Sequence, residues 1–160
     1  MFVLAIAVSV SAYAADTAPR IFPAAQVQEV YRIVLDRDAL LLESINAAIK
    51  EKGVQDGHVT ITAGSVQECT YHYVMSTATK PVDAFKSVKG PFEILNGGGI
   101  VANGEPHIHI TLSSPKGAFG GHLENNCRIL YLGEVTLLKY AGPPLARKKN
   151  ENGVAILQPK

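Results

Sequence analysis

The feature that most constrains this chain is the strict alternation of apolar and polar residues in the segment Pro106–Leu112, PHIHITL. Such alternation is typical of a β-strand with one buried face. Side chains two positions apart on a strand share a face, so His107 and His109 are predicted to point together. The opposite face is wholly apolar and should pack in the core; it carries Ile108, Ile110 and Leu112.

A third histidine follows this predicted strand after a short turn. The intervening segment Ser113–Gly117, SSPKG, contains residues that favour chain reversal. The glycines at 120 and 121 allow close approach of backbone or ligand to the segment that carries His122. We therefore expect His107, His109 and His122 to converge and to leave a fourth coordination position open. That ligand count is typical of a catalytic or exchangeable zinc site, not of a closed structural one.

Composition indicates one compact globular domain. The chain has 160 residues, of which 47% are hydrophobic and 18% charged, a balance that excludes a disordered chain. The formal net charge is +1, so no strong field would attract nucleic acid or anionic lipid.

The first fourteen residues are predicted to be a signal peptide. Met1–Ala14 carries no charge and ends in Ala12-Tyr13-Ala14, which fits an A-x-A cleavage site. The run is too short to cross a membrane. The mature chain would begin near Ala15 and work in the periplasm or outside the cell. No basic residue precedes Arg20, which leaves open whether Met1 is the true start and whether the run is instead an apolar strand or helix of the fold.

One helix is expected near the start of the domain. A lead-in segment, 15–25, and a strand over 26–35 precede it. Asp38 is the predicted N-cap, because its carboxylate can accept from free amides of the first turn. Gly53 is suited to the left-handed position that ends a helix. Between them runs an apolar stripe at helical spacing, formed by Leu41, Leu42, Ile45, Ala48 and Ile49.

The rest of the chain has the alternation and the turns of a sheet. Strands are expected over 58–63, 68–75, 92–95, 100–101, 106–112 and 128–140. The polar stretch 76–90 is predicted to be a mobile loop, Gly64-Ser65 and the glycines at 97–99 to interrupt strands, and Asn103-Gly104 to form a hairpin turn. The prediction is an α+β domain over 26–141, one main helix on a mostly antiparallel sheet, followed by a basic C-terminal tail, 142–160.

Several of these segments together resemble the plants-and-prokaryotes-conserved (PPC) domain family, in its prokaryotic form without an AT-hook. They are "PFEIL", "GGGIVANGEPHIHITLS", "GGHL" and "GEVTL", with "YRIVLDRDALLLESINAAIKEKGV" and "AGSV" upstream. The resemblance covers about Val27 to Tyr140. It implies an α+β fold that assembles as a homotrimer, and a divalent metal, usually zinc, held by His107, His109 and His122.

The resemblance also brings a DNA-binding label that these residues do not support. Plant members carry an AT-hook, whose Arg-Gly-Arg-Pro core enters the minor groove, and prokaryotic relatives are often described as DNA-binding. This sequence contains no such tetrapeptide. The near-neutral net charge and the predicted signal peptide argue against DNA binding as well, so nucleic acid is not the expected partner.

Two further residues are candidates for support of the metal site. His72 lies between Tyr71 and Tyr73 on a predicted strand; it could be an added ligand, could orient a ligand, or could be a half-exposed structural histidine. Glu93 precedes the glycine-rich segment and could orient a ligating imidazole or act as a catalytic base. A plain hydrogen bond to loop amides would explain Glu93 equally well. His58 is assigned a structural role.

The two cysteines, Cys69 and Cys127, are 58 positions apart. Two buried thiols are the default expectation. In an oxidising compartment the cysteines could instead pair, and closing that loop would stabilise the fold by about 4 kcal/mol on the chain-entropy model. The sequence does not show whether their α-carbons come close enough.

Two classes of function fit these observations. The first is a secreted or periplasmic trimeric binding module, whose metal site recognises a small anionic or carbonyl ligand or stabilises the assembly. The second is a zinc-dependent hydrolase acting on a small molecule, since zinc lowers the pKa of bound water. An enzyme needs a base beside the metal, and only Glu93 and His72 are candidates. The binding module is therefore favoured.

Overall fold

A computed structural model describes residues 19–23 and 26–160 of the protein. The predicted signal peptide, Met1–Ala14, lies outside the described residues. Within the described part, no helix combines the length and the apolar character needed to span a membrane.

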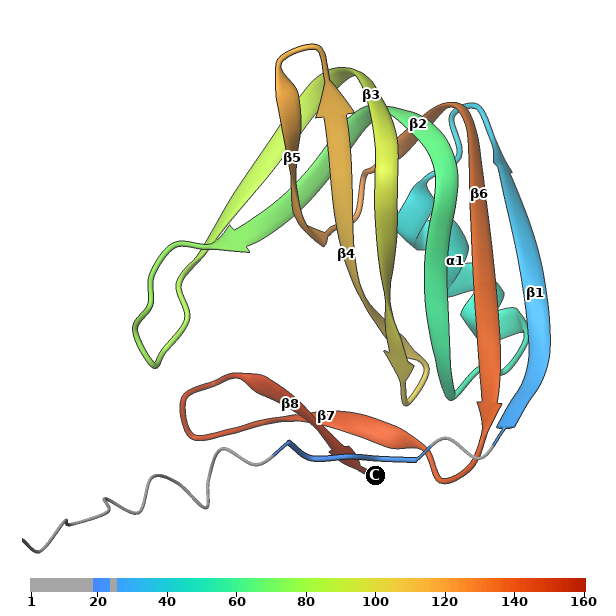
Figure 1. Cartoon of the computed structure of the whole chain (residues 1–160), viewed down its shortest axis with the longest axis vertical. Helices are drawn as coiled ribbons and strands as arrows, with labels where there is room; N and C mark the ends of the chain where they lie inside the picture. The colour runs from blue at the N-terminus through green and yellow to red at the C-terminus, as the bar shows by residue number, and fades with distance from the viewer. Residues whose placement is uncertain (1–18, 24–25) are drawn as a thin grey trace, which may run out of the picture.

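The described residues form one six-stranded antiparallel sheet, one helix and a separate two-stranded hairpin (Figure 1). The helix α1 is Leu41–Glu51. The sheet strands are β1 Gln26–Asp36, β2 Asp56–Val74, β3 Asp83–Ala102, β4 Glu105–Ser114, β5 Gly117–Leu123 and β6 Arg128–Ala141, and the hairpin strands are β7 Leu145–Lys149 and β8 Ala155–Pro159. The predicted α+β class with an antiparallel sheet is confirmed.

The order of the strands is β1-β6-β2-β3-β4-β5, and β5 also pairs with the far end of β2. In that extra pairing His72 lies opposite His122. β2 has nineteen residues. It pairs with β6 over most of its length and with β5 near its end, at Tyr71 and His72. The strands β2, β3, β4 and β5 therefore close on themselves, which brings the two ends of this part of the sheet together.

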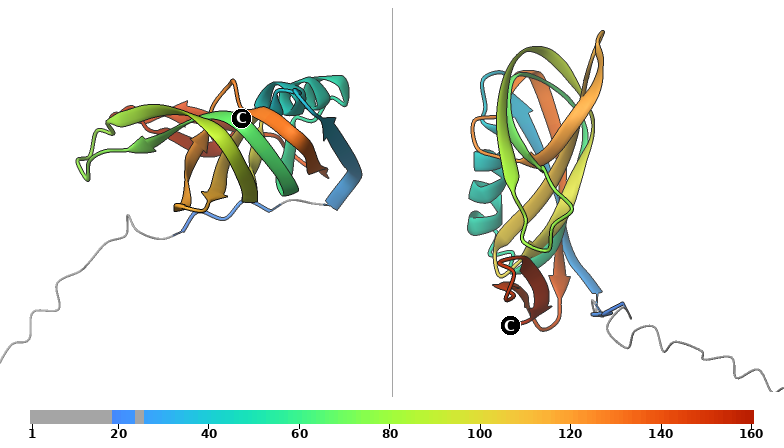
Figure 2. Two further views of the ribbon diagram at one scale, coloured as in Figure 1. Left: turned by 90° about the horizontal axis from the view of Figure 1, so that it is seen from above. Right: turned by 90° about the vertical axis from the view of Figure 1, so that its left-hand side faces the viewer.

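The helix α1 covers one face of the sheet, as Figure 2 shows. Its buried side chains are Leu41, Ile45 and Ile49, on the stripe that the sequence predicts. Eleven residues make it a short helix, so the expectation of one main helix is wrong in size. The sheet supplies most of the core, including Ile108, Ile110 and Leu112, each at most 2% exposed.

The two ends of α1 differ in how far they match the prediction. Gly53 has φ of +59° and takes the left-handed position, as expected. Asp38 is not the N-cap, because the helix begins only at Leu41. The Leu41 amide donates to the Cys127 carbonyl at 2.8 Å, so loop backbone replaces the capping side chain. The Asp38 carboxylate instead accepts from Gln67 Nε2 at 2.6 Å.

The strands β2 and β3 are longer and more continuous than the sequence suggests. Gly64-Ser65 lies inside β2, and the glycines at 97–99 lie inside β3. The stretch 76–90, predicted as a loop, enters β3 at Asp83 and pairs with residues 68–74 of β2. The β3 side of this distal ribbon is mostly exposed, whereas Cys69 and Tyr71 on its β2 side are buried. The β3 residues therefore lack the apolar alternation that marks a half-buried strand, and backbone pairing with β2 forms this part of β3.

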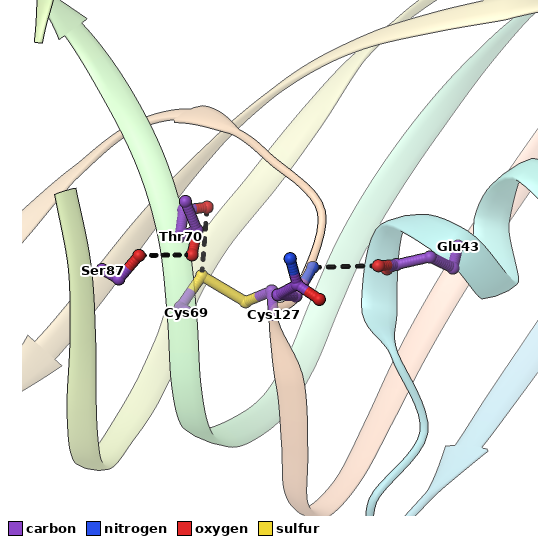
Figure 3. The surroundings of a disulfide bond; sticks show 6 residues. Glu43, Cys69, Thr70, Ser87 and Cys127 are labelled. Carbon is purple, nitrogen blue, oxygen red and sulfur yellow. Dashed lines mark hydrogen bonds between the residues drawn. A yellow bond between two sulfur atoms is a disulfide. The ribbon is translucent and has the colours of Figure 1, made fainter. Parts of the chain in front are cut away.

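A disulfide joins Cys69 on β2 to Cys127 in the loop before β6 (Figure 3). The default expectation of two buried thiols is therefore wrong. Glu68 pairs with Arg128 in the register of β2 with β6, which places Cys69 beside Cys127, with α-carbons 3.8 Å apart. Next to the bridge, the Asn126 amide donates to Glu43 Oε1 at 2.9 Å. The bridge and this bond tie β2, α1 and the loop together.

The segment 142–160 contains the β7–β8 hairpin. It lies across the lower ends of the sheet strands in Figure 1. Arg147 on β7 attaches it to the sheet: its guanidinium donates to the Ile100 carbonyl at 2.9 Å and to the Glu105 carbonyl at 3.1 Å. The hairpin thus contacts the end of the sheet where β3 turns into β4.

Candidate metal centre

A single row of cross-strand neighbours carries most of the candidate site. Thr60 of β2 pairs with Gly98 of β3, Gly98 pairs with His109 of β4, and His109 pairs with His122 of β5. His122 then pairs with His72, at the far end of β2. Directly paired residues have their side chains on the same face of a sheet. The closure of the sheet therefore gathers three histidines from three strands on one face.

That face is the one opposite the core. Ile108 and Ile110, the neighbours of the β4 histidines, are buried, whereas His109 is exposed and His107 is half-buried. The predicted division of this strand into an apolar face and a histidine face is confirmed.

Glycines permit the strands of the site to lie close together. A Cβ atom at Gly99 would collide with the His107 carbonyl oxygen, and one at Gly121 would collide with the His72 carbonyl oxygen. Both contacts are with backbone, which cannot swing away as a side chain can. A larger residue at either position would separate the strands and spread the imidazoles.

The first group of converging side chains is His107, His109 and His122. Their ring nitrogens, one from each residue, lie within 4.8 Å of one another. The Nε2 atoms of His107 and His109 are 3.3 Å apart. Two nitrogens bound to one tetrahedral zinc at the usual Zn–N length are separated by about 3.3 Å. These three residues therefore fit a zinc-like ion.

The protonation of these residues also suits metal binding. Burial, with smaller contributions from the charges of His107 and His72, lowers the pKa of His122 to about 4. Burial, and next the charge of Arg147, also lowers the pKa of His107. Both imidazoles are therefore neutral at pH 7 and have a lone pair for a metal.

A second group overlaps the first and consists of His72, His122 and Glu124, again with ligand atoms within 4.8 Å of one another. His72 stacks on His122 with ring centroids 4.4 Å apart. His72 Nδ1 donates to Glu124 Oε1 at 2.7 Å. Because the carboxylate accepts this hydrogen bond, the neutral imidazole of His72 carries its proton on Nδ1 and has its lone pair on Nε2.

Sequence reasoning missed Glu124 and placed Glu93 near the site instead. Glu124 lies one residue beyond the end of β5, and its spacing of two from His122, at which residues of an extended chain share a face, is a signal for it in the sequence. Glu93 is exposed on β3 opposite Ser113, five positions along the strand from Gly98. It belongs to neither histidine group. His58 is half-buried and pairs with Ile100 and Leu138, also outside both groups.

Two hollows meet at His107 and His109. One, of about 390 Å³, is also lined by Gly98, Gly99 and Arg147. The other, of about 500 Å³, is also lined by His72 and His122. Ala155 of β8 lines both hollows, so the C-terminal hairpin forms one wall of the space in front of the histidines.

The family model of the Plants and Prokaryotes Conserved (PCC) domain matches the chain over residues 23–141. No curated protein matches the chain.

Solved structures with the same fold include three microbial proteins. A metal-containing protein from Archaeoglobus fulgidus has 26% identity and a TM-score of 0.74, with 88% of this chain and 99% of that one covered. A candidate DNA-binding protein from Bacteroides thetaiotaomicron has 22% identity and a TM-score of 0.73, with 87% and 98% covered. A plant- and prokaryote-conserved protein from Pyrococcus horikoshii has 22% identity and a TM-score of 0.70, with 83% and 93% covered.

Proposed function

The chain belongs to the Plants and Prokaryotes Conserved domain family, and from that premise we propose that it is a metal-dependent binding module. In this proposal His107, His109 and His122 hold one divalent ion, zinc or a similar metal. The observation that carries it is the convergence of three imidazoles, two of them with Nε2 atoms 3.3 Å apart. The description of the Archaeoglobus fulgidus protein as metal-containing supports it.

The residues around the ligands suit the exchange of a small molecule. Three protein ligands leave the fourth coordination position of the ion open. When bound, the ion would act as a Lewis acid toward an oxygen atom of a small molecule in that position. Neutral imidazole also suits nickel and copper, so the donor atoms do not select one metal. His72, held by Glu124, stands beside His122 and would keep that ring in place by stacking.

The test is the metal content of purified protein loaded with zinc at neutral pH and then desalted. Wild type should retain about one zinc per chain, and His109→Ala should lose most of it while keeping its circular dichroism spectrum. His58→Ala, a histidine on the same sheet outside both groups, is the matched control and should retain wild-type zinc. Zinc-free wild type, or His109→Ala with wild-type zinc, would overturn the proposal.

We further propose that the module is a homotrimer. Large apolar side chains are exposed on β1 and β6, among them Val30, Val34 and Tyr131, at 58%, 69% and 70%. β1 is also an edge strand of the sheet. Packing between subunits is one way to cover the exposed apolar side chains and the unpaired edge of β1. Light scattering at micromolar concentration should give three times the chain mass; a monomer mass would contradict this.

Action in the periplasm or outside the cell is the third part of the proposal. The Cys69–Cys127 disulfide supports it, because such bonds persist in oxidising compartments. Intact mass of protein recovered from the native cell envelope should correspond to a chain that begins near Ala15. A mass that includes Met1–Ala14 would contradict it.

A second candidate function, zinc-dependent hydrolysis of a small molecule, is favoured by the His72–Glu124 pair. Glu124 fixes the His72 tautomer so that Nε2 can accept a proton. A screen of zinc-loaded protein against ester, amide and phosphoester substrates separates the two functions. An enzyme should lose turnover in His72→Ala and slow about tenfold or more in Glu124→Gln, with zinc content kept in both. No turnover by wild type would leave only the binding module.

A further inference from the structure

We propose that the metal centre takes a small oxyanion, with a carboxylate or phosphate group, and that Arg147 of the C-terminal hairpin binds its negative charge. This inference rests on the proposed function and names the ligand class of the same site. It concerns a residue outside the segment 23–141 that matches the family.

The position of Arg147 is fixed relative to the histidines. Its guanidinium donates to the carbonyls of Ile100 and Glu105, at 2.9 and 3.1 Å. Ile100 is the cross-strand partner of His107. Arg147 therefore lies beside His107, and it lines the same hollow as His107 and His109.

The charge of Arg147 has no ionic partner in the described part of the chain. Arg147 takes part in none of the ion pairs found there, which use other cations; Lys139, for example, contacts Glu29 at 2.9 Å. Burial lowers the pKa of Arg147 and the charge of the Glu105 carboxylate partly offsets this, but among the described residues no carboxylate lies within ion-pair distance of the guanidinium. Two carbonyls occupy two of the five N–H donors of a guanidinium, and three remain. A half-buried cation with free donors, in one hollow with His107 and His109, is suited to a planar or tetrahedral oxyanion.

The dimensions of the site favour a small molecule. The Arg147 hollow of about 390 Å³ joins the second hollow of about 500 Å³ at His107 and His109. Volumes of this order accommodate metabolite-sized ligands. A ligand could bind Arg147 through its charged group and reach the histidine centre with a second oxygen, which is the chemistry of a dicarboxylate or a phosphorylated metabolite.

The test is titration calorimetry of full-length, zinc-loaded protein with three probes: succinate, inorganic phosphate and neutral succinamide. Succinate or phosphate should bind, succinamide should not, and the stronger of the two anions identifies the charged group. Arg147→Gln should weaken anion binding at least tenfold with zinc content unchanged. Lys148→Gln, the same loss of charge on an exposed neighbouring residue, is the matched control and should bind as wild type does.

A second pair of variants separates the charge of Arg147 from its role in attaching the hairpin. Ala155 is exposed and lines both hollows, and replacing it leaves both Arg147 hydrogen bonds in place. Ala155→Glu and Ala155→Gln have the same size and differ only in charge. The Glu variant should lose anion binding at least tenfold relative to the Gln variant, with intact circular dichroism in both.

Equal affinity of the Ala155 variants, or no binding of either anion by wild type, would overturn the inference. Each titration is repeated on metal-free protein, and the zinc content is measured separately. Protein that holds no zinc but binds succinate or phosphate through Arg147 would contradict the metal site alone. Protein that holds zinc and binds neither anion would contradict the anion site alone.

Discussion

The two faces of the sheet have opposite character although the same strands build both. The face under α1 is apolar and closed: Val59, Ile61 and Leu137 are fully buried there. On the other face lies the row that ends in His109, His122 and His72, with one residue exposed and two half-buried. Because strand side chains alternate, neighbouring residues such as His109 and Ile110 serve different faces. Stability and binding can therefore be changed one at a time, by substitutions a single position apart.

The largest effect should come from charging the closed face. Ile110 is 2% exposed, so Ile110→Asp would bury an unpaired carboxylate and lower the free energy of unfolding by more than about 4 kcal/mol. Thr111→Asp, one position along and exposed, should change it by less than about 1 kcal/mol. Urea unfolding followed by circular dichroism measures both. Equal losses in the two variants would contradict the division into faces.

The next effect concerns the disulfide, which stabilises the closed face without contacting the histidines. Replacing both Cys69 and Cys127 with Ala should lower the free energy of unfolding by about 4 kcal/mol, from the entropy of a loop of this length. The zinc content measured at neutral pH should stay that of wild type. As a control, a reducing agent should destabilise wild type and leave the double variant unchanged. A loss of zinc in the folded double variant would show that the two faces are coupled.

The smallest effect is a pH dependence that belongs to the histidine face. The pKa of His122 is about 4 in the folded protein, below its ordinary 6.5, so on acidification the unfolded chain takes up the proton first. Metal-free protein should therefore lose stability as pH falls from about 6.5 to about 4 and lose little more from this group below that. The lowered pKa of His107 acts in the same direction.

Thermal unfolding of metal-free wild type and of His122→Gln, compared from pH 7.5 to pH 4, measures this contribution. The variant should show a shallower decline over the window. A variant profile that runs parallel to wild type would assign the pH dependence to other groups.

The sequence predicts features that depend on local order. The alternation around His107 and His109 identifies both the strand and its two faces, because a period of two leaves no other arrangement for an apolar core. Gly53 likewise signals the end of α1 through its own backbone freedom.

Features that depend on pairing between distant strands remain open from the sequence alone, as with the role of His72 and the pairing of the two cysteines. Nothing near His72 in the sequence indicates that it lies opposite His122, and that pairing also brings in Glu124. The Cys69–Cys127 bond follows in the same way from the register of β2 with β6, which local patterns do not reveal. At the start of β3, residues 83–89 are mostly exposed, so this part of the strand lacks the apolar alternation from which the sequence could predict it.

The attachment of the C-terminal hairpin has a consequence for how this protein can diversify. Arg147 binds the sheet through the carbonyl oxygens of Ile100 and Glu105, and every amino acid presents a carbonyl. The receiving surface therefore places little demand on the identity of those two residues. A change of side chain at 100 or 105 would therefore leave both hydrogen bonds available, and the hairpin can keep its place while the sequence of the sheet beneath it changes.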